Sequence, residues 1–287
     1  MQTLRTLATA IALTALIALP AQAEVFVFTA IPDQDESELE ARFNAIGAYL
    51  EETLDVEVRY VPVKSYAAAV TAFRNNQVQL AWFGGLSGVQ ARARVPDSQA
   101  LARGVEDEGF RSYIIAHEST GLSPSDTLGS ALRDKTFTFG SKSSTSGRLM
   151  PEYHLRDQLG EAPEETFERV GYSGNHSRTL RLVESGSYEV GAINFAVWER
   201  ELADGNIDTD SVQVIWETPG YLNYQWSIRG DVDDRFGEGF TDRVQDALLA
   251  MDDPALLERF PRSGFVPVSN DDYAGLKETA QTIGLID

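Results

Sequence analysis

The pattern of hydrophobic and polar positions divides the first third of the chain into alternating strands and helices. Residues 25–30 are rich in β-branched and aromatic side chains, which is typical of a buried strand. A capping box, Ser37-x-x-Glu40, follows it, and apolar residues then recur at helical spacing up to Leu50. The alternation continues with strands over 56–63 and 79–84 and helices over 65–76 and 86–94. Strands separated by helices predict a parallel sheet covered on both faces.

The same alternation restarts in the second third of the chain, after a loop at residues 118–126 that is rich in Ser, Gly and Pro. The expected elements are strands over 110–117, 137–139, 167–171, 190–194 and 213–216, helices over 177–184 and through Trp198, and an extended aromatic run over 221–228. Helices over 240–251 and 272–283 follow, and we expect no strand in this C-terminal segment.

The pattern therefore predicts an α/β protein with two lobes, the second inserted into the first. Lobe 1 comprises residues 24–112 and 221–287, and lobe 2 comprises residues 113–220. Ligands of open α/β sheets bind outside the carboxyl ends of the strands, so we expect a ligand in the cleft between the lobes, with closure by hinge bending.

The first 23 residues have the pattern of a secretory signal peptide. Arg5 precedes an apolar run over 7–19, and the sequence Pro-Ala-Gln-Ala ends at Ala23. We expect cleavage after Ala23 and an exported protein located in the periplasm. No later apolar run reaches membrane-spanning length, so we expect no membrane insertion.

Composition excludes several classes of function. The chain has 44 acidic and 24 basic residues and a net charge of −20, which argues against nucleic acid or an anionic membrane as a partner. It has no cysteine and therefore no disulfide or thiolate metal site. His117, His154 and His176 lack the spacing of a zinc hydrolase, and no G-x-S-x-G elbow occurs. We expect no enzyme, no metal and no cofactor.

Residues 137–150 carry the most informative chemistry. A short strand runs into Gly140, and Ser144, Thr145, Ser146 and Gly147 then precede a helix. The first amides of a helix lack internal partners and carry partial positive charge, so such a start can hold an anion, to which the hydroxyl groups add donors. The same residues can also form an ordinary N-cap, which is their commonest use.

Pro151 affects the start of this helix. It cannot donate to the carbonyl of Gly147, so the helix should begin late or bend there.

Three segments resemble one protein family. They are LAWFG at 80–84, STSG at 144–147 after a Phe-x-Phe-Gly strand, and YSGNH at 172–176. The family is that of the periplasmic phosphate-, phosphite- and phosphonate-binding proteins of ABC importers, and its members labelled as selenate-binding are the most similar. The resemblance covers essentially the whole mature chain. It implies the type II periplasmic binding protein fold, capture of a tetrahedral oxyanion and delivery to a membrane permease.

The resemblance also implies a set of ligand-binding residues. Ser144, Thr145 and Ser146, with Gly147, match the loop that holds the oxyanion. His176 matches a histidine that faces this loop, and Tyr66 matches an aromatic residue that closes over the ligand from the first lobe. From the residues alone, a lone histidine such as His176 is more often a structural or surface residue, and Tyr66 could equally belong to the core. The roles of five further residues stay open, namely Tyr221, Tyr224, Trp226, Arg148 and Arg178.

Asn194 departs from part of the family. It stands where aminophosphonate binders use a carboxylate. A ligand ammonium buried in a closed cleft needs an anionic partner, so this difference argues against 2-aminoethylphosphonate.

These observations predict a monomeric solute-binding protein of an ABC importer that captures a phosphonate, phosphite, phosphate or selenate-like anion. One alternative is a periplasmic oxyanion-sensing subunit that docks on a receptor histidine kinase. A weaker alternative is an enzyme in which Ser146 and His176 form a nucleophile–base pair.

Overall fold

The structure is a computed structural model that describes residues 24–286. The predicted signal peptide and its cleavage after Ala23 lie outside the described residues. Within them, no helix has both the length and the hydrophobicity that crossing a bilayer requires.

Lobe 1 is built on a six-stranded mixed sheet. Strands β1, β2 and β3 pair in parallel, as the alternation of strands and helices predicts, whereas β10 is antiparallel to both β3 and β4, and β11 is antiparallel to β4. The spatial order is β11 (Phe265–Pro267), β4 (Gln99–Gly104), β10 (Gln225–Ile228), β3 (Leu80–Phe83), β1 (Phe26–Ala30) and β2 (Val58–Tyr60).

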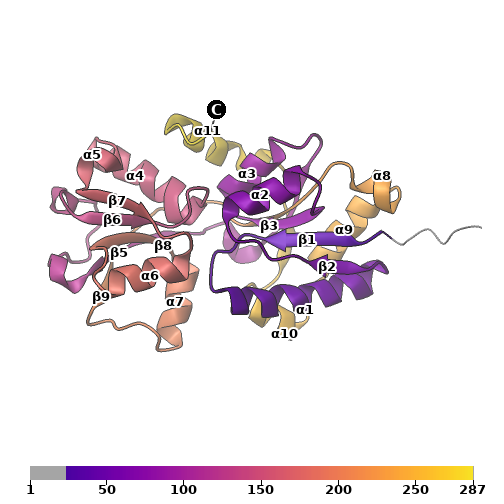
Figure 1. The fold of residues 1–287 in the computed structure, drawn as a ribbon, viewed down its shortest axis with the longest axis horizontal. Coiled ribbons are helices and arrows are strands. Elements are labelled where there is room, and N and C mark those ends of the chain that lie inside the picture. Colours follow the sequence, from indigo (N-terminus) through magenta and orange to yellow (C-terminus); the bar gives the residue numbers. More distant parts are fainter. Residues whose placement is uncertain (1–23, 287) are drawn as a thin grey trace, which may run out of the picture.

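Helices cover both faces of this sheet. Figure 1 shows α1 and α10 on one side and α2 and α3 on the other. The helices of lobe 1 are α1 (Glu36–Leu54), α2 (Tyr66–Arg74), α3 (Gly85–Arg92), α8 (Val232–Phe236), α9 (Phe240–Leu249), α10 (Pro254–Arg259) and α11 (Ala274–Thr282). Short 3₁₀ turns in the chain are Val105–Asp107, Glu118–Thr120, Ser130–Leu132 and Asp271–Tyr273.

The expectation of no strand in the C-terminal segment is wrong. Phe265–Pro267 forms β11, which pairs with β4 at the edge of the lobe 1 sheet. A strand of three residues is too short to show alternation, and its hydrogen bonds go to a partner more than 150 positions away. Its position therefore depends on tertiary pairing rather than on local pattern.

Lobe 2 contains a five-stranded mixed sheet. Its order is β7 (Arg169–Tyr172), β6 (Thr136–Phe139), β8 (Val190–Asn194), β5 (Ser112–His117) and β9 (Val212–Glu217). Strand β6 is parallel to β7 and β8, whereas β5 is antiparallel to β8 and β9. The helices are a five-residue π-helix (Thr145–Leu149), α4 (Met150–Leu159), α5 (Pro163–Thr166), α6 (His176–Glu184) and α7 (Phe195–Ala203).

Two chain segments connect the lobes, one between β4 and β5 and the other between β9 and β10. They meet at a pair of antiparallel hydrogen bonds, in which Phe110 and Tyr221 each donate an amide to the other's carbonyl at 3.0 and 2.9 Å. Ser112 already pairs with Asn194 in the lobe 2 sheet. The predicted α/β fold with one lobe inserted into the other is confirmed.

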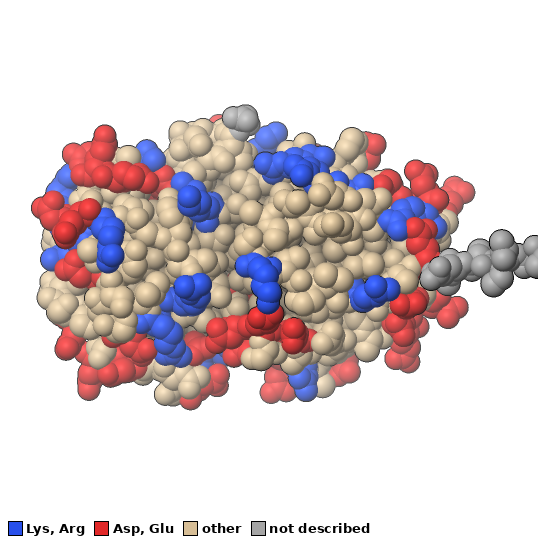
Figure 2. All heavy atoms as spheres, in the orientation of Figure 1, with Lys and Arg blue, Asp and Glu red and all other residues tan. Residues whose placement is uncertain are grey.

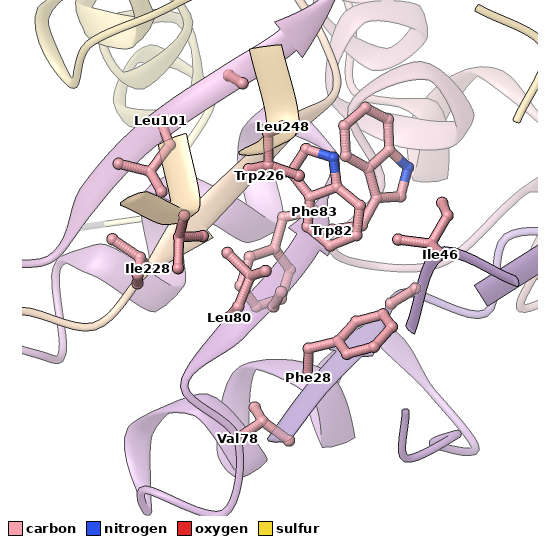
Figure 3. Close-up of a cluster of buried hydrophobic side chains, with 14 of the residues drawn as sticks. Phe28, Ile46, Val78, Leu80, Trp82, Phe83, Leu101, Trp226, Ile228 and Leu248 are labelled. Atoms are coloured by element: carbon pink, nitrogen blue, oxygen red, sulfur yellow. The ribbon is translucent and has the colours of Figure 1, made fainter. Parts of the chain in front are cut away.

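An aromatic core holds the carboxyl ends of β1 and β3 in lobe 1. Phe28, Trp82 and Trp226 lie in one cluster, in which the Trp226 ring centroid is 5.3 Å from that of Trp82 and 6.0 Å from that of Phe28 (Figure 3). Aromatic pairs at this spacing gain energy beyond simple burial. The cluster therefore makes a stiff platform for the loops that follow these two strands and face lobe 2.

Candidate functional site

The loop between β6 and α4 has the bent helix start that Pro151 predicts. The amide of Leu149 donates to the carbonyl of Ser144 at 3.0 Å, five residues back, which makes the first turn a π-turn. The carbonyl of Gly147, which Pro151 cannot serve, accepts the amide of Gly140 at 2.7 Å. The π-turn therefore ties the helix start directly to the end of β6.

Ser144 caps this helix start, since its Oγ accepts the amide of Gly147 at 2.9 Å. A β-carbon at Gly147 would lie only 3.0–3.1 Å from Ser144 Oγ, the Cα of Gly140 and Cε1 of His176. Such contacts are tighter than most real Cβ contacts, so any side chain here would force its neighbours, including the backbone of Gly140, to move by a few tenths of an ångström. The capping function expected of these residues is present, and it uses the Ser144 hydroxyl as an acceptor rather than as a donor.

The three hydroxyl residues face the boundary between the lobes. Ser144, Thr145 and Ser146 are 2%, 1% and 1% exposed. The amide of Leu86, at the start of α3 in lobe 1, donates to Oγ1 of Thr145 at 2.9 Å. Because Oγ1 already accepts a hydrogen bond, the proton of this hydroxyl remains available for another acceptor.

His176 lies behind Ser146 as a neutral imidazole. Its Nδ1 accepts the amide of Asn194 at 3.2 Å, so its proton resides on Nε2, which is 3.3 Å from Ser146 Oγ. Complete burial lowers the pKa of His176 to about 3. With Nε2–H as a donor, His176 cannot accept the proton of Ser146, so the nucleophile–base pairing of these two residues has no geometric support.

Tyr66 brings lobe 1 to the same loop. It is the first residue of α2, is 1% exposed and follows the N-cap Ser65. Burial and the charge of Asp33 raise the pKa of the Tyr66 phenol well above its usual value, against the opposing effect of a hydrogen bond with Ser144. The phenol therefore stays protonated and lies beside the hydroxyl loop.

Asn194 lies behind His176 as seen from the loop Ser144–Gly147. Its Oδ1 caps α7 by accepting the amide of Val197 at 2.7 Å, and its Nδ2 donates to the hydroxyl of Tyr224 at 3.2 Å. That hydroxyl in turn donates to Oδ2 of Asp33 at 2.8 Å. The carbonyl of Asp33 accepts the amide of His176 at 2.9 Å, so this buried chain of bonds joins the two lobes.

The structure thus brings Ser144, Thr145, Ser146 and Gly147 together with His176 and Tyr66, and places Asn194 behind His176.

Among the residues whose roles the sequence left open, Tyr221 is at the site, because its hydroxyl is 2.6 Å from Ser112 Oγ and also hydrogen-bonds Ser146. Tyr224 belongs to the Asp33 relay, Trp226 to the core, and Arg148 pairs with Glu152 at 3.0 Å. Arg178 lines a pocket with Asp35 and Lys64.

Sequence reasoning missed two polar residues at this site, Asp33 and Asn223. Both are buried, at 4% and 1% exposure. Each stands in a loop that begins or ends a strand of lobe 1, without a motif of its own. The only signal for Asn223 was its position in the second connecting segment.

A small enclosed cavity of about 20 Å³ lies between the lobes next to Asn194. Its walls include Asp33 and Tyr224 together with the guanidinium groups of Arg42 and Arg262. Arg262 makes a two-bond pair with Asp107 at 2.7 and 2.9 Å, whereas Arg42 donates to neutral oxygens of Arg259 and Gln34. The space is large enough for about one water molecule.

Among the described residues, no group of His, Cys, Asp and Glu side chains is arranged to hold a metal ion. The polar groups that contact the loop Ser144–Gly147 are amides, phenols and a neutral imidazole, which can hydrogen-bond an anion, whereas the Asp33 carboxyl group is bound to Tyr224.

Comparison with known proteins defines the class. Residues 28–273 match the family model of the periplasmic substrate-binding proteins of phosphonate ABC transporters, and the chain belongs to this family. The type II fold and the resemblance found in the sequence agree with this result.

Among individual relatives, the chain is 39% identical over 264 residues to the probable ABC transporter phosphite binding protein PhnD1 of Prochlorococcus marinus (strain MIT 9301), covering 90% of this chain and 89% of the relative. The structure of PhnD1 in complex with methylphosphonate superimposes with a TM-score of 0.86 at 38% identity, covering 91% of this chain and 99% of that one. The phosphate-import protein PhnD of Mycolicibacterium smegmatis is 23% identical over 290 residues, with coverage of 91% and 86%.

Proposed function

We propose that this ABC transporter substrate-binding protein captures a small tetrahedral oxyanion, above all phosphite or methylphosphonate, on the loop Ser144–Gly147. The observation that carries the proposal is the state of the three hydroxyl groups. N–H donors from Gly147, Leu86 and His176 fill one acceptor position on each, and the further partners of Ser144 and Ser146 are the phenols of Tyr66 and Tyr221, which can donate as well as accept, so the hydroxyl protons can turn to a ligand. Three convergent donors at a helix start suit an anion with several acceptor oxygens.

His176 adds to this preference as a fixed neutral donor. Its Nδ1 is occupied by Asn194, so the ring cannot take a proton from the ligand without losing that bond. We propose that His176 orients Ser146 rather than titrating with the ligand.

The size of the cavity next to Asn194 supports a ligand with a short substituent. A space of about 20 Å³ is too small for an aminoethyl chain. The relative PhnD1 is described as phosphite-binding and has been crystallised with methylphosphonate, which carries only a methyl group. We therefore propose that 2-aminoethylphosphonate binds poorly.

The net charge of −20 does not prevent anion capture, because charge is distributed unevenly. Figure 2 shows Asp and Glu side chains mainly at the two ends and along the lower edge, whereas the region over α2 and α3 carries separate Lys and Arg side chains on an uncharged background. Charges more than ~10 Å away are largely screened at physiological ionic strength.

The partner proposed for the closed form is an ABC permease. The family and the relatives named above are all transport proteins, and none of these comparisons favours a receptor kinase. A monomeric state in solution stays a prediction.

A binding panel tests the proposal. The mature chain is titrated with phosphite, methylphosphonate, phosphate, sulfate, selenate and 2-aminoethylphosphonate, and binding is followed by thermal shift and calorimetry. Phosphite or methylphosphonate should raise the melting temperature most, since a ligand at 100 times its Kd stabilises the native state by about 2.7 kcal/mol. No shift with either, or a larger shift with the aminoethyl compound, would refute the proposal.

A further inference from the structure

Three buried side-chain atoms have no hydrogen-bond partner among the described residues. They are Ser98 Oγ, Asn223 Nδ2 and Trp226 Nε1. Ser98 precedes β4 at the far end of α3, and Trp226 lies in the aromatic core (Figure 3). Only Asn223 lies against the hydroxyl loop. A buried donor without an acceptor is destabilising, so this one requires an explanation.

The orientation of the Asn223 amide is fixed by its neighbours. Its Oδ1 accepts the amide of Gly85 at 3.2 Å, and its backbone amide donates to the carbonyl of Asp107 at 3.0 Å. A flipped side chain would set Nδ2 against the Gly85 N–H, donor against donor. Nδ2 is therefore the atom left over, in a residue that is 1% exposed.

Asn223 and Thr145 hold the same turn of α3 from opposite lobes. The backbone amide of Gly85 donates to Oδ1 of Asn223, and the next amide, that of Leu86, donates to Oγ1 of Thr145. A β-carbon at Gly84 would lie 3.4 Å from Thr145 Oγ1 and 3.5 Å from Asn223 Oδ1. The unpaired amide of lobe 1 is thus next to the hydroxyls of lobe 2.

We propose that Asn223 is a further ligand-binding residue, whose Nδ2 donates a hydrogen bond to an oxygen of the bound oxyanion. The inference rests on the function proposed above. An anionic oxygen is the acceptor that this donor lacks, and the bond would tie the ligand to the segment that connects the lobes. Asn223 is then a lobe 1 counterpart to Thr145.

Asn223→Asp tests this assignment, because it keeps an oxygen for Gly85 and replaces the NH₂ donor with an acceptor. The Kd for methylphosphonate, measured by calorimetry at pH 8, should rise by about 100-fold or more. The ratio of variant to wild-type Kd should fall as pH is lowered toward 5, because a protonated carboxyl can donate again.

The matched control is Asn270→Asp, the same change in the same lobe. The side-chain amide of Asn270 is bonded at both ends, since its Oδ1 accepts the amide of Ala100 and its Nδ2 donates to the carbonyl of Ser98, and it lies at the opposite end of α3. It should lower thermal stability and leave the Kd within about twofold, because it touches no group at the site. An Asn223→Asp variant with wild-type affinity, or a Kd ratio that is constant with pH, would overturn the inference.

A measurement on the unmodified protein keeps the inference testable if Asn223→Asp does not fold. The side-chain NH₂ signals of Asn223, assigned by NMR, should shift on saturation with methylphosphonate, whereas those of Asn270 should not. Methylphosphonate binding without a shift at Asn223 would refute the inference alone, and no binding of any oxyanion by the wild type would refute the proposed function.

Discussion

Two strand–turn–helix units of the same design meet at the centre of this molecule and use their helix starts differently. In lobe 1, β3 runs through Gly84 into α3, and the first amides of α3 are taken by Asn223 and Thr145. In lobe 2, β6 runs into the π-turn at Thr145, where Ser144 Oγ accepts the amide of Gly147 and also hydrogen-bonds the phenol of Tyr66.

The difference shows what a helix start needs in order to hold a ligand. The amides of α3 are occupied by protein oxygens, so this end of lobe 1 binds the other lobe. The π-turn of lobe 2 carries hydroxyls that each accept one N–H group and still have a proton to donate. The same backbone motif therefore joins the lobes in one case and, in the function proposed above, holds the ligand in the other.

The largest expected effect comes from removing two hydroxyls of the lobe 2 loop. Thr145→Val combined with Ser146→Ala should weaken methylphosphonate binding by about 3 to 6 kcal/mol, because each lost hydrogen bond to a charged group contributes about 1.5 to 3. Calorimetry measures the change.

Two controls sharpen the comparison between the lobes. Thr138→Val makes the same change on β6, where the hydroxyl donates to the carbonyl of Phe139, and Ser87→Ala removes a hydroxyl from the first turn of α3 that donates to Gly84. Both should leave affinity within about fivefold, a range worth ~1 kcal/mol. Equal losses in the Ser87 variant and the double variant would contradict the assignment of different functions to the two helix starts.

A smaller effect should appear in the dependence of stability on pH. Burial lowers the native pKa of His176 to about 3, whereas an unfolded histidine titrates near 6.5. Between these values the unfolded state binds the extra proton, so His176 lowers the free energy of unfolding by roughly 1.4 kcal/mol for each pH unit below 6.5. At pH 5 the wild type should have lost about 2 kcal/mol more than His176→Gln, relative to pH 7.

Urea unfolding of both proteins at pH 7 and pH 5 measures this difference. Because the carboxylates titrate in both proteins, the comparison isolates the histidine. Parallel pH profiles would mean that His176 is accessible to protons in the native state.

The smallest effect should come from a surface contact between the lobes. Arg200 of α7 pairs with Glu38 of α1 at 2.8 Å, with side chains 27% and 44% exposed. Arg200→Gln should weaken ligand binding by less than about 1 kcal/mol, and less still in high salt, since exposed ion pairs contribute little. A tenfold loss of affinity would show that closure depends on this contact and not on the buried bonds at Thr145 and Asp33.

The structure of the loop Ser144–Gly147 and its flanking strand and helix could be predicted from the sequence, because the residues that determine it are neighbours in the chain. The strand before Gly140, the run of hydroxyls and the effect of Pro151 all act within about ten residues, and the structure has each of them. Tyr66 and His176 came only from the resemblance, since neither a lone aromatic residue nor a lone histidine indicates what it faces.

The rest could not be predicted because it depends on distant pairing. Strand β11 exists through its bonds to β4, and Asn223 acquires its significance from Gly85, 138 positions earlier in the chain. Asp33 likewise depends on Tyr224, 191 positions away. Short elements and single amides of this kind carry no periodicity that a sequence pattern could reveal.

The bond between Leu86 and Thr145 has a consequence for release of cargo. When the two lobes separate, the hydroxyl of Thr145 loses the Leu86 amide that directs its proton. A bound anion then loses an aligned hydrogen-bond donor in the same step. Binding of the ligand and closure of the lobes therefore depend on the same hydrogen bond. A transporter that forces the halves apart would weaken the hold without touching the guest itself.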